Sequence, residues 1–183
     1  MSHDEAAAGR TAEPGDVIVA ADAIGTAVFI LTAVIAAASF STAAQWVGAI
    51  TAMSLFVIGV AAFLWAFYNA VQRSRTEQVS VTQLFLLLGD AVPARVRRIM
   101  LSLVVVQFLT ALLTTLARPD GPDGSPGSSL AVGFLVVMFG LGLNGLWAAF
   151  HGRFSPRDDL GDTTGGTAVN ESAQRRDKNE DHG

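Results

Sequence analysis

Residues 23–72 read AIGTAVFILTAVIAAASFSTAAQWVGAITAMSLFVIGVAAFLWAFYNAVQ, a run of fifty positions without a single Asp, Glu, Lys or Arg. The hydrocarbon core of a bilayer is about 30 Å thick, so a helix needs about 20 consecutive apolar residues to cross it. The run is therefore long enough for two membrane-spanning helices joined by a tight turn. It predicts that lipid, and not water, surrounds the middle of the chain.

Two further uncharged runs follow, at residues 99–117 and 126–152, and each is long enough for one more span. A soluble domain of 183 residues has too little interior to bury four helices that are apolar on every side. The sequence therefore predicts an all-α fold, a four-helix transmembrane bundle. The expected spans are 17–39, 46–69, 98–117 and 129–151.

The two ends of the chain are polar. Residues 1–16 hold four acidic residues and one Arg, and residues 153–183 show no apolar periodicity. Segments of this kind bury too little apolar surface to fold alone. We expect disordered cytoplasmic tails at 1–16 and 153–183, on either side of a membrane domain at 17–152. The first apolar run is too long for a cleavable signal peptide and fits a retained signal anchor better.

Basic residues beside the spans predict the orientation of the chain. Five arginines lie between the second and third spans and two follow the fourth: Arg73, Arg75, Arg95, Arg97 and Arg98, then Arg153 and Arg157. Lys and Arg are enriched in cytoplasmic loops. The loop after the second span and the segment after the fourth lie on the same side of the membrane when the number of spans is even. With basic segments facing the cytoplasm, we therefore expect both termini in the cytoplasm. The arginine-rich, alanine-rich composition is associated with bacteria, which suggests the bacterial cytoplasmic membrane.

The middle loop contains an apolar segment, residues 79–92, that is too short to cross a bilayer. Four of its residues follow the i, i+3, i+4, i+7 spacing of one helix face: Val81, Leu84, Phe85 and Leu88. We therefore expect a short interfacial helix over about residues 79–89, lying on the cytoplasmic surface of the membrane.

Three arginines follow at the start of the third span: Arg95, Arg97 and Arg98. Cations near a helix N-terminus oppose the helix dipole, so they do not stabilise the helix from within. They either enforce the topology or bind an outside partner. Anionic lipid headgroups are the first candidate for that partner, and an acidic patch on another membrane protein is the second.

Polar residues inside the predicted spans form a short set. Asp22, Gln107 and Asn144 fall at a similar depth in the cytoplasmic half of the bundle, counted at 1.5 Å per residue. We hypothesise that they meet in the interior, with the carboxylate accepting hydrogen bonds from the two amides. Such a cluster either holds the helices together or forms a proton or ligand site.

The sequence offers no set of residues for catalysis. Cysteine is absent, two of the three histidines lie in the tails, and no metal, nucleotide or dinucleotide motif occurs. We therefore expect no catalytic residues, no cofactor, no metal and no enzyme activity. No basic surface for nucleic acid is evident either.

Two stretches carry a resemblance, VTQLFLLLGDAVPARVRRIMLSLVVVQ at 81–107 and MFGLGLNGLWAAFHGRF at 138–154. They resemble segments of uncharacterised four-span integral membrane proteins of actinobacteria. The resemblance implies a bacterial four-span membrane protein, and it implies no activity, cofactor or site residue.

Several functions fit these observations. The first is a non-catalytic accessory or scaffold component of a bacterial membrane complex, with the lipid bilayer and other membrane proteins as partners. The second is a small transporter or channel, working as a single chain or as a dimer, in which Asn144 within its glycine cluster marks the candidate break in a helix. The third is a protein that responds to anionic lipids through the basic loop.

Overall fold

The computed structural model describes residues 14–154, apart from residues 40, 76, 78, 90, 122–123 and 125–128. The elements in these residues are α1 (Pro14–Ser39), α2 (Thr42–Arg73), α3 (Val81–Phe85), α4 (Ala94–Ala117), the 3-10 helix η1 (Ser129–Val136) and α5 (Val137–His151). The tails predicted to be disordered fall mainly on residues 1–13 and 155–183, which lie outside the described residues.

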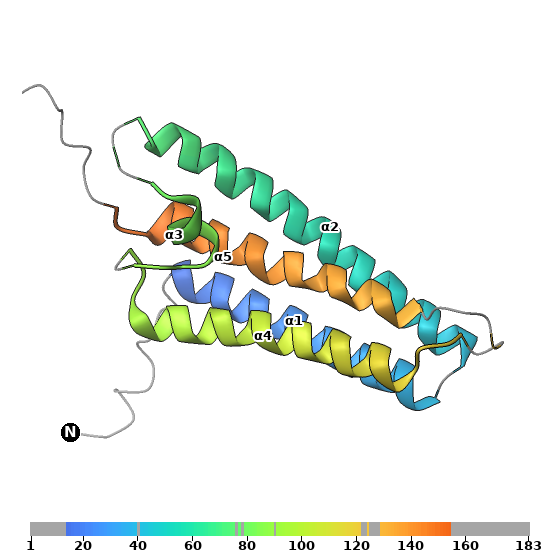
Figure 1. The fold of residues 1–183 in the computed structure, drawn as a ribbon. Helices are drawn as coiled ribbons and strands as arrows, with labels where there is room; N and C mark the ends of the chain where they lie inside the picture. Colours follow the sequence, from blue (N-terminus) through green and yellow to red (C-terminus); the bar gives the residue numbers. More distant parts are fainter. Residues whose placement is uncertain are drawn as a thin grey trace, which may run out of the picture.

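Four long helices run side by side along one direction, and η1 continues directly into α5 to complete the fourth (Figure 1). Each of the four is long and apolar enough to cross a membrane. The predicted all-α bundle of four spans is confirmed, as is the short helix between the second and third spans. The chain is a multi-pass membrane protein.

The first three long helices extend beyond the predicted spans, mainly at their N-terminal ends, whereas the fourth occupies residues 129–151 as predicted. α1 begins at Pro14, so the prediction of a disordered segment up to residue 16 is wrong for its last three residues. Proline suits this position because the first turn of a helix does not need its N–H. α2 begins at Thr42, directly after Ser41, whose hydroxyl accepts a hydrogen bond from the N–H of Ala44 at 3.3 Å.

The fourth span is the central helix of the bundle. Half (50%) of its most apolar 18-residue stretch is buried, against 22% of the corresponding stretch in each of the other three spans. Its glycines explain this position, because an added Cβ at Gly142 would collide with the carbonyl oxygen of Gly59 in α2. Likewise, an added Cβ at Gly59 would collide with the backbone of Phe139. Small residues let two helix backbones approach closely, which is how spans associate in lipid.

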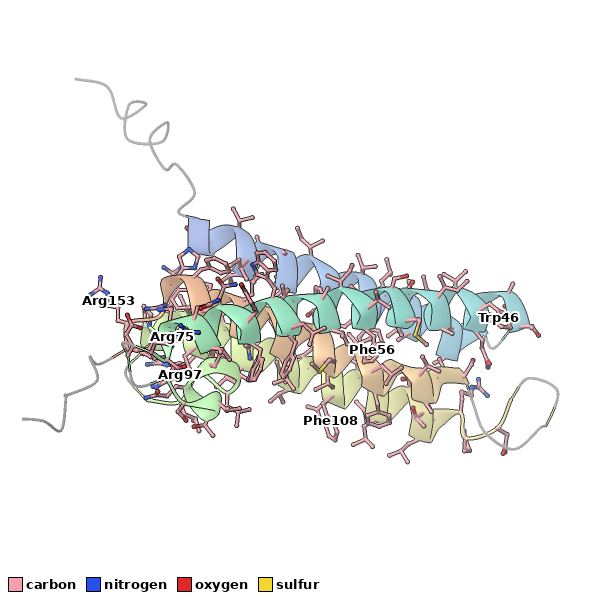
Figure 2. The ribbon with its side chains drawn as sticks, turned by 90° about the horizontal axis from the view of Figure 1, so that it is seen from above. Trp46, Phe56, Arg75, Arg97, Phe108 and Arg153 are labelled. Atoms are coloured by element: carbon pink, nitrogen blue, oxygen red, sulfur yellow. The ribbon has the colours of Figure 1, made fainter. Side chains whose placement is uncertain are left out.

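The outer surfaces of α1, α2 and α4 carry large apolar side chains. Ile24, Ile50 and Leu113 are each at least 60% exposed. The two ends of the bundle differ in charge: Trp46 lies at one end, whereas Arg75, Arg97 and Arg153 lie together at the other (Figure 2). Apolar sides between polar ends are what a bilayer requires.

α3 is shorter than the predicted interfacial helix at 79–89. It starts where the N–H of Ser80 donates to Oε1 of Gln83, at 3.2 Å. It ends at Phe85, because Leu87 and Gly89 both adopt left-handed conformations, with φ of 52° and 84°. Such residues interrupt a right-handed helix.

The apolar face predicted for this segment is also wrong in part. The four residues do not form one shared surface, because Val81 and Leu88 are exposed whereas Leu84 and Phe85 are buried in the bundle. The ring of Phe85 stacks on Phe63 of α2, with centroids 4.1 Å apart. α3 therefore packs against the end of the bundle near the C-terminus of α5, as Figure 1 shows.

Candidate functional site

Asp22 and Gln107 form a buried polar contact between α1 and α4. Both side chains are completely buried, and Nε2 of Gln107 donates to Oδ1 of Asp22 at 3.2 Å. The same nitrogen donates to Oγ1 of Thr26 at 2.7 Å, one turn further along α1. A single amide group thus binds two side chains of the neighbouring span.

This contact is made possible by a glycine in the central helix. An added Cβ at Gly140 would lie 2.7 Å from Oε1 of Gln107, so the amide packs directly against the α5 backbone. The side chain of Gln107 is thereby enclosed between α1 and α5. A close fit of this kind restricts the amide to one position.

Asn144 is also completely buried, but it does not join Asp22. Its Nδ2 donates to the backbone carbonyl oxygen of Phe85 at 3.2 Å. The hypothesis that the carboxylate accepts bonds from both amides is therefore corrected: Gln107 makes this bond, and Asn144 instead holds α3 against α5. The carbonyl of Phe85 is available to Asn144 because Phe85 is the last residue of α3. The last carbonyls of a helix have no partner within the helix.

Three acceptor oxygens of this interior are buried and have no hydrogen-bond partner: Oδ2 of Asp22, Oε1 of Gln107 and Oδ1 of Asn144. Leaving buried polar atoms unpaired costs free energy, especially in a region surrounded by lipid. The carboxylate can accept a proton, and all three oxygens can accept hydrogen bonds from N–H groups or bind cations. Among the described residues, no three His, Cys, Asp or Glu side chains come together as a metal site.

The basic end of the bundle contains an arginine whose role the sequence did not reveal. Arg73, at the end of α2, donates from Nη1 to the carbonyl of Ala149 at 2.8 Å and from Nη2 to that of Gly152 at 3.2 Å. It also forms an ion pair with Glu77 at 2.8 Å. The guanidinium therefore binds the carbonyl end of α5, where a cation is favoured by the helix dipole. Position beside the membrane was the only signal in the sequence, and it did not distinguish this arginine from the others.

The three arginines predicted to contact lipid lie in the first turns of α4. Arg95 and Arg98 are exposed, whereas Arg97 is partly buried and donates from Nη1 to the carbonyl of Gly89 at 2.9 Å. Arg97 thus fastens the loop between α3 and α4. The other two guanidinium groups face the surroundings of the bundle at its basic end.

In the comparisons with known proteins, no protein-family model, no curated protein and no solved structure matches this chain.

Proposed function

We propose that this protein is a non-catalytic component of a bacterial membrane complex, which holds other membrane proteins through the lipid-facing sides of its spans. The supporting observation is the way the polar interior is bonded. Gln107 joins α1 to α4, and Asn144 joins α5 to the middle loop. Bonds of this kind hold a bundle in one shape.

The apolar surfaces of the outer spans supply the area for such contacts. Large side chains are exposed along α2 from Val47 to Val71. Within lipid, packing between helices replaces the hydrophobic effect as the cause of association, so a partner span must fit these side chains closely.

Site-specific photo-crosslinking in native membranes tests this proposal. A photoreactive amino acid is placed at Ile50, Val57 or Leu64, which all face outward on α2, and in a second series at Ile24 of α1. We expect adducts with one other membrane protein from one helix face only. Adducts spread evenly over both helices, or none at all, would contradict the scaffold function.

A small transporter or channel is the second candidate, and one observation favours it. The unpaired oxygens of Asp22 and Gln107 are acceptors that a proton or a cation would satisfy. Flux assays in vesicles separate the two functions: replacing Asp22 by Asn abolishes transport if the carboxylate carries the ion. Equal flux in protein-free vesicles would exclude this alternative.

We further propose that Arg95 and Arg98 contact anionic lipid headgroups on the cytoplasmic side. Both are exposed at the basic end of the bundle. Basic residues near an anionic surface contribute about 1 kcal/mol each. With Arg95 and Arg98 on the cytoplasmic side, the termini and the loop between α2 and α4 also lie in the cytoplasm. Fusions of reporter enzymes to the middle loop will test this orientation.

A further inference from the structure

The carboxyl group of Asp22 lies in the interior of the bundle with little to stabilise a negative charge. Its side chain is completely buried, and Oδ1 accepts one hydrogen bond from Gln107 at 3.2 Å. Its other oxygen, Oδ2, has no partner among the described residues. Asp22 is in the third turn of α1, beyond the first turn in which a helix dipole favours an anion. An ionised carboxylate in such surroundings is costly unless a cation neutralises it.

The elements packed around Asp22 place no cation beside it. α1 packs against α2, α4 and both parts of the fourth span, and the basic side chains on the described residues of these elements all lie at the basic end. They are Arg73, Arg95, Arg97, Arg98 and His151. The other two ionisable side chains, Asp16 and Tyr68, are exposed on the outside of the bundle. The carboxyl group therefore needs an ion from outside the protein to remove its charge.

A proton fits this site better than a metal ion. The amide of Gln107 turns its Nε2 toward Oδ1 of Asp22, at 3.2 Å, and toward Oγ1 of Thr26, at 2.7 Å. Hard metal cations are bound by oxygen ligands, and here they would meet an N–H donor between the two oxygens. Direct hydrogen bonds also leave no space for an ion between these groups. A proton needs no such space, and it removes the charge of the carboxylate.

Polar atoms without a partner continue from this site toward the basic end. Asn144, Trp147 and His151 lie on one face of α5, at the i, i+3, i+7 spacing, and Gly140 on the same face packs against Gln107. Each of the three has a buried atom that bonds to none of the described residues: Oδ1 of Asn144, Nε1 of Trp147 and Nδ1 of His151. Buried polar groups are nearly always paired with protein or with ordered water, so water is the expected partner here.

This row of polar atoms also reaches α1. An added Cβ at Gly15 would lie 2.9 Å from Nε1 of Trp147 and 3.5 Å from Cδ2 of His151. Gly15 precedes Asp22 by roughly 10 Å along α1, at 1.5 Å per residue. His151 is only partly buried, so one end of the row is in contact with the water outside. Water molecules bound along the row would connect the surface at the basic end with the carboxyl group.

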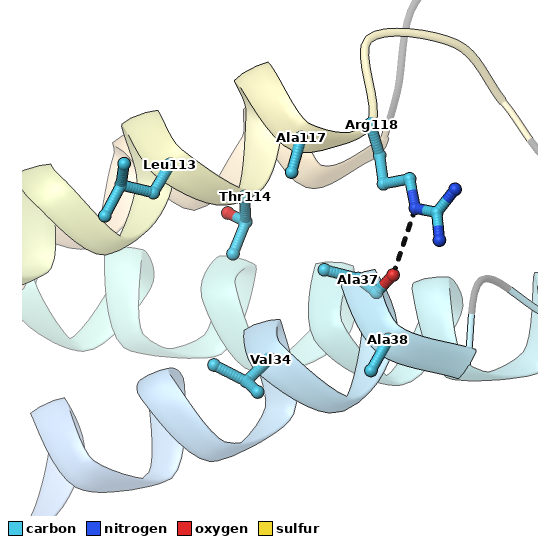
Figure 3. A pocket seen from close by; sticks show the side chains of 7 residues that line it. All are labelled: Val34, Ala37, Ala38, Leu113, Thr114, Ala117 and Arg118. Carbon is cyan, nitrogen blue, oxygen red and sulfur yellow. Dashed lines mark hydrogen bonds between the residues drawn. The ribbon is translucent and has the colours of Figure 1, made fainter.

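The bundle is apolar in the opposite direction, toward the end that carries Trp46. A groove between α1 and α4 does open there, but its wall begins at Val34, and its one hydroxyl, that of Thr114, donates within its own helix to the carbonyl of Thr110 at 2.8 Å (Figure 3). Between this groove and Asp22 the buried side chains include Phe29 and Ala33 of α1, Ala111 of α4 and Val136 of η1. Within the described residues, a path of polar atoms therefore leads to Asp22 from the basic end only.

We propose that Asp22 binds a proton, which reaches it from the basic end through water molecules bound at His151, Trp147 and Asn144. Binding forms one O–H bond on the carboxylate, takes one proton from the water outside, and leaves a neutral carboxylic acid beside Gln107. This inference rests on the second candidate function for treating Asp22 as an ion-binding group, and it names the proton as that ion. A protein that holds the proton but shows no flux would disprove transport and leave the binding site intact.

Infrared spectroscopy of the full chain in vesicles, with the aspartate carboxyl groups labelled by a heavy carbon isotope, tests the protonation. A carboxylic acid and a carboxylate absorb at separate frequencies, so we expect a carboxylic-acid band from the unaltered protein at neutral pH. Asp22→Asn should remove this band, whereas Asp16→Asn, at an exposed position of the same helix, should keep it. The proposal is overturned if the band is absent at neutral pH, survives Asp22→Asn, or disappears when sodium or potassium ions are added.

Transfer into heavy water tests the route, because the band shifts as the bound proton exchanges for deuterium. Trp147→Phe removes the indole N–H and keeps an aromatic ring, and His151→Phe removes both ring nitrogens. Each is expected to slow the exchange roughly tenfold, which corresponds to the loss of about one hydrogen bond along the path. Trp65→Phe on the exposed side of α2 is the matched control and should leave the rate unchanged. Equally fast exchange in all of these proteins would overturn the route from the basic end.

Discussion

The fourth span and the three others differ in how much of their surface is buried inside the protein. The four spans are similarly hydrophobic, with a mean hydropathy of 1.9 to 2.3 over the most apolar stretch of each, yet the fourth has more than twice the buried fraction of any other. α1, α2 and α4 turn most of their side chains outward. Hydrophobicity therefore does not decide which helix takes the centre. In lipid the surrounding chains are as apolar as leucine, so close packing of small residues decides the position.

The two kinds of span also use their polar residues differently. Asp22 and Gln107 join two outer spans to each other, whereas Asn144 joins the central helix to a segment outside the spans. The first contact fixes the distance between helices. The second fixes a loop against the end of the bundle. Four mutational experiments sharpen this comparison.

The largest effect is expected from Gly142→Ala in the central helix. The new methyl group would collide with the carbonyl oxygen of Gly59, and both surfaces are backbone that cannot give way. We expect a loss of about 3 kcal/mol in the free energy of unfolding, at the upper end for an overpacked interior. Unfolding by a denaturing detergent measures it.

Ala61→Val, on the lipid-facing side of α2, is the control and adds more volume than the glycine substitution does. It is expected to change stability by less than about 0.5 kcal/mol. If the two substitutions lower the free energy of unfolding equally, then the central position of the fourth span does not make it more sensitive to added volume than α2.

Asn144→Leu is expected to cost about 1–2 kcal/mol, because it leaves the carbonyl of Phe85 buried without a donor. Hydrogen exchange in residues 81–89 should rise at the same time, since the loop loses its bond to α5. Asn69→Leu serves as control, as Asn69 donates only within its own helix, to the carbonyl of Trp65 at 2.8 Å. Unchanged exchange in the loop would show that apolar packing alone holds α3.

Gln107→Leu tests the contact between the outer spans, with an expected cost of about 0.6 kcal/mol, the average for hydrogen bonds between membrane helices, and at most about 1.7. Combining it with Asp22→Leu forms a double-mutant cycle. The two costs should not add, because each substitution already removes the same bond. Strictly additive costs would mean that Asp22 and Gln107 contribute separately.

The smallest effect on the fold is expected from Arg95→Gln together with Arg98→Gln. Both side chains are exposed, so stability in vesicles of neutral lipid should change by less than about 0.5 kcal/mol. In vesicles of anionic lipid the wild type should gain about 1 kcal/mol per arginine, and the gain should fall as salt is added. If anionic lipid stabilises the double variant as much as the wild type, Arg95 and Arg98 do not bind the headgroups and serve only to set the orientation of the chain in the membrane.

Particular residues show where prediction from the sequence succeeded. The ends of three spans, at residues 39, 117 and 151, agree with the structure, because apolar helices stop where the run of apolar residues stops. The contact of Asp22 with Gln107 follows from their similar depth, since buried polar groups in lipid find each other. Depth alone did not predict the partner of Asn144, because a backbone carbonyl carries no signature in the sequence.

The sequence by itself determined that lipid surrounds the middle of the chain, that there are four spans, and that a short helix lies in the middle loop. Length and hydropathy along the chain are local properties, so the sequence is enough to predict them. Only the tertiary structure decided which span lies at the centre, where Phe85 packs, and which arginine binds the end of α5. Those choices depend on the fit of two surfaces distant in the chain, as where Gly142 meets Gly59. In a bilayer, close packing of this kind drives the association of helices, which in water is driven mainly by the hydrophobic effect.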